Sequence, residues 1–121
     1  LIILTDQFTR NVFRGTPRSF SGDMLALRTC LHCLCSFDVS QQKKERSHFI
    51  LIPLMHSENL KFQEMSMPLF RMHTSEKVYQ YALKHKNIIA RFGRFPHRNV
   101  ILGRTSTKSE IQFLKSPGSS F

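Results

Sequence analysis

The densest group of side chains that could do chemistry lies between residues 91 and 104. Four arginines and a histidine fall within it: Arg91, Arg94, His97, Arg98 and Arg104. An arginine presents a planar set of N–H donors that matches a carboxylate or a phosphate. We therefore predict an anion-binding site in this segment. An alternative stays open, because the same arginines could pair with the protein's own carboxylates in a buried ionic network.

A second arginine group, Arg10, Arg14 and Arg18, lies near the start of the chain. Arg10 and Arg14 are four residues apart, which places them on one face of a helix. We predict that all three contribute to anion binding. Asp6 precedes Arg10 by four residues, so an intrahelical ion pair is the simpler alternative for Arg10.

His56 and His97 are the candidates for general acid–base chemistry, because an imidazole titrates near neutral pH. Asp6 and Glu58 are the carboxylates that could act with them. Ser57 is more simply a helix cap than a nucleophile. The sequence has no Gly-x-Ser-x-Gly elbow, no phosphate-cradling glycine loop and no His-Glu-x-x-His motif. Enzyme classes with such signatures are therefore disfavoured, and we expect no cofactor.

One cluster, Cys30, His32, Cys33 and Cys35, has residue types that bind metals. Zinc requires four ligands that converge tetrahedrally. On a helix, Cys30 and Cys33 share a face while the other two side chains point elsewhere, and no second cysteine pair completes the set. We therefore predict structural thiols in an apolar stripe and no metal.

Helices must position these residues, because apolar residues recur at helical spacing and no stretch alternates with the period of a strand. The predicted helices cover about residues 1–13, 23–36, 40–54, 57–68, 75–92 and 107–116. Short connections between them favour antiparallel helix pairs. The predicted fold class is therefore all-α, with five to six helices in a single domain over residues 1–121.

Local signals predict where the helices begin and end. The predicted N-caps are Asp23, Ser40, Ser57, and Thr74 or Ser75. Thr107 and Glu110 form a capping box, and Gly93 is suited to end a helix in the left-handed conformation. Pro53 is expected to kink or end its helix and Pro68 to limit the next one, because proline has no backbone N–H.

Composition narrows the classes of partner. The 121 residues carry a net charge of +10, which favours nucleic acid, phosphorylated ligands or an acidic protein face. A solvated basic surface is the simpler alternative. No apolar run approaches the ~20 residues that cross a bilayer. Because no signal-peptide pattern is present either, we expect a cytoplasmic protein that does not associate with membranes.

The first helix has an apolar face formed by Leu1, Leu4, Phe8 and Val12. The chain has no initiator methionine, and its opening is typical of a helix buried in a larger core. We expect helices that precede this chain to cover the face. The chain would then form the C-terminal two-thirds of a longer domain.

Five segments together resemble a known family: Asp6–Phe20, Pro53–Glu58, Arg91–Gly103, Arg104–Leu114 and Pro117–Phe121. The order of these motifs is similar to that in the bacterial family called domain of unknown function 924. The resemblance implies a tetratricopeptide-like helical fold and a cytosolic protein, with no established reaction to carry over. Between residues 29 and 46 the chain departs from the family pattern, because it is rich there in cysteine and lysine.

Three functional hypotheses follow. The first is a helical binding or interaction module whose arginines hold an acidic peptide or a small anion. The second is an enzyme in which His56 or His97 acts with Asp6 or Glu58 while arginines stabilise an anion. The third, ranked last, is non-specific nucleic-acid binding, because the basic residues are confined to motifs and do not form a continuous stripe. The oligomeric state is left open.

Overall fold

The computed structural model describes residues 1–36 and 38–121. Its α-helices over these ranges are α1 (Thr9–Val12), α2 (Asp23–Ser36), α3 (Lys44–Met55), α4 (Leu60–His73), α5 (Glu76–Phe92) and α6 (Lys108–Leu114). A π-helical segment, Ile3–Phe8, leads directly into α1, and short 3-10 turns cover Pro17–Phe20, Val39–Gln41 and Pro96–Arg98. These ranges contain no strand. The prediction of an all-α fold is confirmed.

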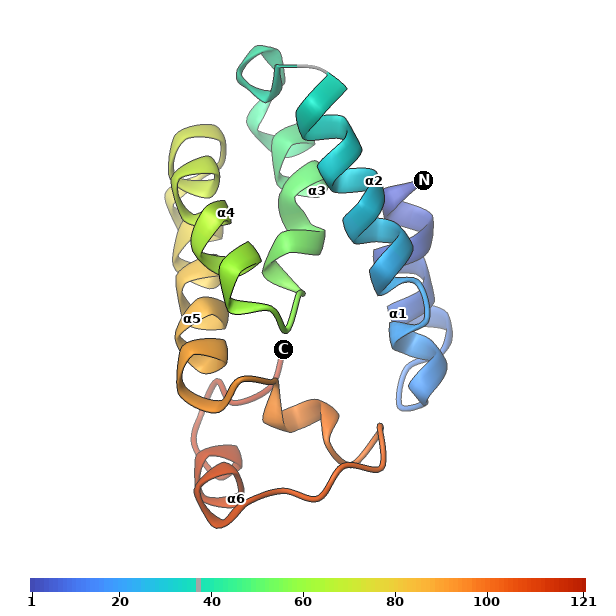
Figure 1. Cartoon of the computed structure of the whole chain (residues 1–121), viewed down its shortest axis with the longest axis vertical. Coiled ribbons are helices and arrows are strands. Elements are labelled where there is room, and N and C mark those ends of the chain that lie inside the picture. Colours follow the sequence, from blue (N-terminus) through green and yellow to red (C-terminus); the bar gives the residue numbers. More distant parts are fainter. Residues whose placement is uncertain (37) are drawn as a thin grey trace.

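Helices α2 to α5 lie side by side, and each runs antiparallel to the one before it (Figure 1). Helix α3 lies between α2 and α4, and α5 packs along α4. The α6 helix and the connection that precedes it form the far end of the molecule. From there the last residues return toward the end of α3. The predicted antiparallel helix pairs are therefore present.

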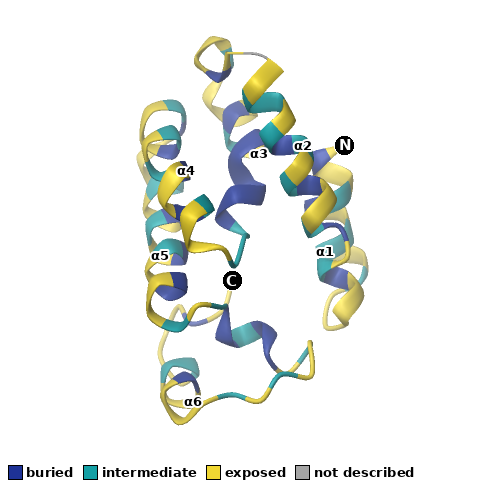
Figure 2. Ribbon diagram, in the orientation of Figure 1, coloured by how far each residue is buried: buried dark blue, intermediate teal, exposed yellow. Residues whose placement is uncertain are grey.

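The core forms around α3, because residues 50–55 of this helix are all buried (Figure 2). Leu51 and Leu54 have no exposed surface, and they belong to one apolar cluster with Cys30 of α2, Phe70 of α4 and Ala82 of α5. A helix that is apolar on every side needs partners on every side. The helices on both sides of α3 supply them.

The helix end expected at Pro68 is not observed, whereas α3 does end two residues after Pro53. Helix α3 continues to Met55 with Pro53 buried inside it, and α4 continues past Pro68 to His73. A proline removes one N–H donor and strains the turn before it. Here the burial of α3 outweighs that local penalty, and Pro68 is exposed on the outer side of α4.

Two predicted N-caps are also wrong. Ser40 lies in the short turn Val39–Gln41, where its N–H donates to Asp38 Oδ1 at 2.8 Å, and α3 begins only four residues later. Asn59, and not Ser57, caps α4, because Asn59 Oδ1 accepts the Lys61 N–H at 3.0 Å. Short polar side chains compete for the same capping position, and their spacing alone does not rank them.

The remaining predicted helix ends agree with the structure. Ser75 caps α5, and Gly93 ends it with a φ of 71°. Thr107 and Glu110 form the capping box of α6, each side chain accepting the other residue's backbone N–H. Asp23 begins α2, but its carboxylate binds Arg10 and Arg98, and no described backbone N–H donates to it as the predicted N-cap role requires.

The apolar face of the first helix lies at the surface. The exposed fractions are 67% for Leu1, 60% for Leu4, 56% for Phe8 and 54% for Val12. Helical spacing does place these residues on one face, but no described part of the chain covers it. No helix of the described ranges combines the length and the apolar character that a membrane crossing requires.

The three cysteines are all free thiols in α2. Cys30 is buried, Cys33 is half-buried and Cys35 is exposed. Burial raises the pKa of Cys30 to about 12, and Cys33 adds to the effect, so this thiol is unreactive at neutral pH. No group of three His, Cys, Asp or Glu side chains among residues 1–36 and 38–121 is placed to hold a metal ion.

Candidate anion-binding site

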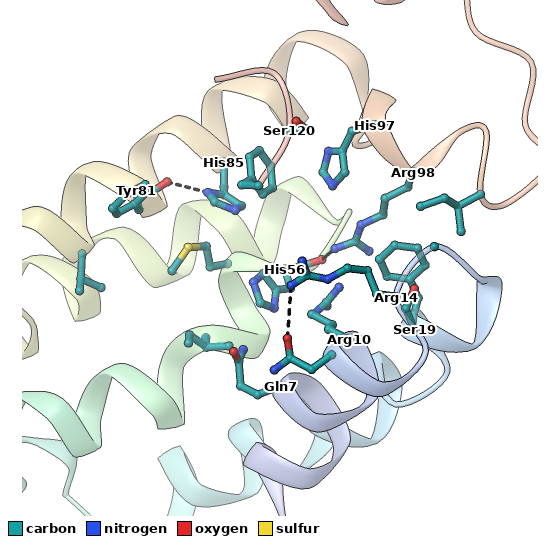
Figure 3. Close-up of a pocket in the computed structure, with 18 of the residues that line it drawn as sticks. Gln7, Arg10, Arg14, Ser19, His56, Tyr81, His85, His97, Arg98 and Ser120 are labelled. Atoms are coloured by element: carbon teal, nitrogen blue, oxygen red, sulfur yellow. Dashed lines mark hydrogen bonds between the residues drawn. The ribbon is translucent and has the colours of Figure 1, made fainter. Parts of the chain in front are cut away.

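A cavity of about 830 Å³ opens where the first helical segment, α3, α5 and the turn Pro96–Arg98 meet (Figure 3). Its volume lies in the range typical of small-molecule sites. The cationic and imidazole side chains that line it are Arg10, Arg14, His48, His56, Lys77, His85, His97 and Arg98. None of the residues that line this cavity is Asp or Glu.

Asp6 and His56 meet at the wall of the cavity. Asp6 Oδ1 lies 2.7 Å from His56 Nδ1, although the two residues are 50 positions apart. Burial raises the pKa of Asp6, but the His56 hydrogen bond and the charge of Arg10 outweigh burial and leave this pKa below its ordinary value. Asp6 is therefore an acceptor at neutral pH, so His56 donates through Nδ1–H and its Nε2 carries the lone pair.

The pKa of His56 is lowered, so the imidazole is neutral at pH 7. Burial is the largest cause, and the charges of Arg10 and Arg98 act in the same direction. The hydrogen bond to Asp6 opposes them. His56 closes the C-terminal end of α3, directly after the buried Met55, so the rigid core helix determines its position.

Asp23 bridges two guanidinium groups behind the cavity. Its Oδ1 accepts from Arg10 Nη2 at 2.7 Å, and its Oδ2 accepts from Arg98 Nη1 at 3.0 Å. Arg10 also lies 3.3 Å from Asp6, and Arg98 Nη2 donates to the His56 carbonyl at 3.0 Å. Both carboxylates line a separate, smaller pocket of about 190 Å³. The arginines therefore stand between these carboxylates and the larger cavity.

Three buried nitrogen atoms of the cavity wall make no hydrogen bond to any described residue. They are Nε of Arg10, Nε of Arg98 and Nδ1 of His97. A buried donor without a partner is costly, and native proteins contain few. Two charged Nε–H donors therefore lie beside one cavity without an acceptor among the described residues.

Arg14 and Lys77 add positive charge that no described carboxylate offsets. Asp6 and Asp23 balance the charges of Arg10 and Arg98 through the contacts above, whereas no ion pair to Arg14 or Lys77 is present in the described ranges. Arg14 is exposed, and its Nη2 donates only to Asn11 Oδ1 at 3.4 Å. The side chains of the cavity wall therefore include two positive charges without an ion pair among the described residues, which favours a ligand of negative charge.

Two further histidines of the cavity are neutral at pH 7. His85 donates through Nδ1–H to the Tyr81 carbonyl at 2.7 Å, since a carbonyl only accepts. Burial lowers the pKa of His85 to about 3 despite this bond, and the neighbouring His56, His97 and Arg98 contribute. Burial, Arg98 and Arg10 lower the pKa of His97 to about 4.

Other predicted site residues lie outside the cavity, in a second ionic cluster. Arg104 binds Glu58 with two contacts of 2.8 and 3.0 Å, and its Nε donates to Asn99 Oδ1 at 2.9 Å. Arg94 binds Glu110 with two contacts of 2.7 and 2.9 Å. Asn99 joins the two pairs, because its Nδ2 lies 3.3 Å from Glu110. Glu58 is therefore a partner of Arg104 and of neither histidine.

The last two predicted arginines stack on aromatic rings. The guanidinium carbon of Arg18 lies 4.1 Å from the centre of the Phe13 ring, and that of Arg91 lies 4.7 Å from the centre of the Phe92 ring. Neither lines the cavity. Of the candidates, the larger cavity brings together Arg10, Arg14, His56, His97 and Arg98. Asp6 and Glu58 line the smaller pocket with His56 and Arg98, and the other candidates, Arg18, Arg91, Arg94 and Arg104, line neither.

Sequence reasoning missed Gln7, His48, Lys77, His85 and Phe121. Of these five, only His85 could have been predicted from the sequence, because it lies on the otherwise apolar face of its helix. A titratable residue in an apolar stripe is a sign of a buried polar site. The other four become neighbours only through the tertiary fold.

The fold and the site define an all-α protein of stacked antiparallel helices with a cationic cavity at the end of its core helix. The chain belongs to the family described as bacterial protein of unknown function (DUF924), which matches residues 1–118. No curated protein matches it.

A solved structure of a protein of unknown function from Agrobacterium tumefaciens is similar, with a TM-score of 0.88 and 33% identity. The similarity covers 94% of this chain and 64% of that one, so the chain spans less than two thirds of that protein's length. The resemblance found in the sequence is thereby confirmed as family membership.

Proposed function

We propose that this chain is a binding protein for a small anionic ligand, which it holds in the large cavity through Arg10, Arg14 and Arg98. The observation that supports the proposal is the cavity wall. It combines four cationic side chains with no Asp or Glu side chain, and the Nε–H groups of Arg10 and Arg98 are buried there without an acceptor among the described residues.

The arrangement suits an anion for an electrostatic reason. Asp6 and Asp23 hold the two guanidinium groups from behind, so the arginines are positioned before a ligand arrives. A positioned donor loses little side-chain entropy on binding. Charge-assisted hydrogen bonds to a carboxylate or phosphate are about twice as strong as neutral ones.

Calorimetric titration with inorganic phosphate, acetate and 2-naphthoate tests the proposal. Arg14→Gln removes an exposed positive charge from the cavity, and we expect it to weaken the tightest anion about tenfold. Arg28→Gln removes a charge from an exposed site outside the cavity and is the matched control. Equal affinities for both variants and the parent protein would contradict the proposal.

A second candidate function is general base catalysis by His56, and the Asp6–His56 contact favours it. A carboxylate that fixes the Nδ1–H tautomer leaves Nε2 as a base of defined position. Hydrolysis of activated aryl esters and aryl phosphates is a direct assay. Activity that survives His56→Gln unchanged, in a protein that still folds, would remove this candidate.

A further inference from the structure

Resting on the proposed function, we propose that the ligand is a small organic anion with an aromatic or similarly planar apolar body. Its anionic group would lie at Arg10, Arg14 and Arg98, and its body would extend toward Tyr81. The cavity wall has two chemically different ends, and a bare inorganic ion would use one of them.

The two ends are separated in space. Figure 3 shows Arg10, Arg14 and Arg98 at one end of the cavity and Tyr81 at the other, with His56 and His85 between them. Tyr81 belongs to α5, whereas the arginines come from the first helical segment and the turn Pro96–Arg98. A ligand that contacts both ends must therefore be elongated.

The end near Tyr81 carries apolar side chains beside one cation, because Lys77 lies one helical turn before Tyr81 on α5. Ile52 and Met55 of α3 and Val78 of α5 line the same cavity. Apolar surface that a ligand removes from water contributes to binding roughly in proportion to its area. Acetate or phosphate would leave these side chains in contact with water, whereas a ligand with an apolar body would cover them.

The middle of the cavity already accommodates an aromatic ring of the protein itself. The Phe121 ring centre lies 3.8 Å from that of His85, 4.6 Å from that of His97 and 5.5 Å from that of Phe95. The separations from His97 and Phe95 are typical of aromatic contacts, and the one from His85 is shorter. Because His85 stays neutral at pH 7, its ring offers a stacking face and no charge.

An acidic peptide is the competing partner. It would place carboxylates at the arginines but has no planar apolar group for the end near Tyr81. The two partners therefore differ in their dependence on Tyr81, which is half exposed. Its backbone carbonyl, and not its side chain, accepts the His85 hydrogen bond, so Tyr81→Ser keeps that contact.

The experiment compares four probes by calorimetry at pH 7 and low salt: 2-naphthoate, its neutral analogue 2-naphthylmethanol, acetate and inorganic phosphate. We expect 2-naphthoate to bind at least tenfold more tightly than each of the other three. Tyr81→Ser should weaken 2-naphthoate about tenfold and leave acetate and phosphate unchanged. Phe8→Ser removes an exposed aromatic ring outside the cavity and should change nothing.

Each of the other outcomes contradicts either this inference alone or the proposed function as well. If acetate or phosphate binds as tightly as 2-naphthoate, the inference fails and the proposed function stands. If 2-naphthylmethanol matches 2-naphthoate, or if no anion binds, the proposed function fails as well. A third outcome has three parts: a poly-glutamate peptide binds tightly, Tyr81→Ser does not weaken it, and 2-naphthoate does not bind. The ligand would then be an acidic chain and not a small anion.

Discussion

Two arginine–carboxylate clusters lie close together in this protein, and they differ in whether the Nε–H groups of their arginines have acceptors. We call the first the open cluster (Asp6, Arg10, Asp23, His56, Arg98) and the second the closed cluster (Glu58, Arg94, Asn99, Arg104, Glu110). In the closed cluster, the Nε–H of each arginine donates to Glu110 or to Asn99. In the open cluster, the Nε–H groups are buried without partners beside a cavity.

This difference distinguishes arginines that stabilise the fold from arginines that line the proposed binding site. Arg94 and Arg104 donate to groups of the protein itself. Arg94 joins the loop that follows α5 to the start of α6, and Arg104 binds Glu58 in the connection between α3 and α4. The Nε–H donors of Arg10 and Arg98 have no acceptor among the described residues. Substitutions in the closed cluster should therefore change stability most, and substitutions in the open cluster should change binding most.

The largest expected effect is loss of stability on Glu110→Gln. The Glu110 side chain accepts from Arg94 and Asn99 and from the Thr107 backbone. Removing the charge leaves these donors poorly paired, and we expect the free energy of unfolding to fall by about 3 kcal/mol. Urea denaturation measures it. Glu64→Gln, at an exposed site on α4, is the control, and equal losses in both variants would contradict the closed cluster's role.

A slightly smaller loss is expected for Gly22→Ala. A Cβ at Gly22 would lie 1.9 Å from the Thr5 carbonyl oxygen, so the backbone would have to move. We expect a loss of about 2 kcal/mol. Because Gly22 brings Asp23 up to Arg10, the variant should also weaken anion binding. The neighbouring Ser21→Ala should leave both stability and binding nearly unchanged.

Acid should lower the free energy of unfolding, and a part of this loss should depend on Glu110. Arg94 and the Thr107 backbone, against the effect of burial, lower the pKa of Glu110 from its ordinary value of 4.5 to about 2. A lowered folded-state pKa means that its stabilisation is complete above pH 4.5 and is lost as the pH falls toward 2. Urea midpoints between pH 5 and 2 should decline, and Glu110→Gln should decline less steeply. Parallel curves would show that Glu110 does not carry the effect.

The smallest expected change in stability is that of Arg14→Gln. Arg14 is exposed and makes one long hydrogen bond, so the free energy of unfolding should change by no more than about 0.5 kcal/mol. The same variant should lose most of its anion affinity. A large loss of stability would show that Arg14 stabilises the fold, as the arginines of the closed cluster do.

The sequence predicted the helices better than the contacts between them. Periodicity and the capping box located α5 and α6, because their signals are local. The expectation that Pro68 limits its helix is wrong, because the packing of α4 against α3 and α5 outweighs the lost backbone hydrogen bond. Arg98 and Arg104 belong to one motif and have the same chemistry. Only the folded chain decides that one faces a cavity and the other faces Glu58.

The most direct test observes the four arginine Nε–H groups by NMR while 2-naphthoate is added to the full chain. We expect the Nε–H signals of Arg10 and Arg98 to shift on binding, because a negative charge then lies beside their guanidinium groups. Those of Arg94 and Arg104 should stay in place, since Glu110 and Asn99 already bind them. Equal shifts in all four signals, or no shift at Arg10 and Arg98, would contradict the distinction between the two clusters.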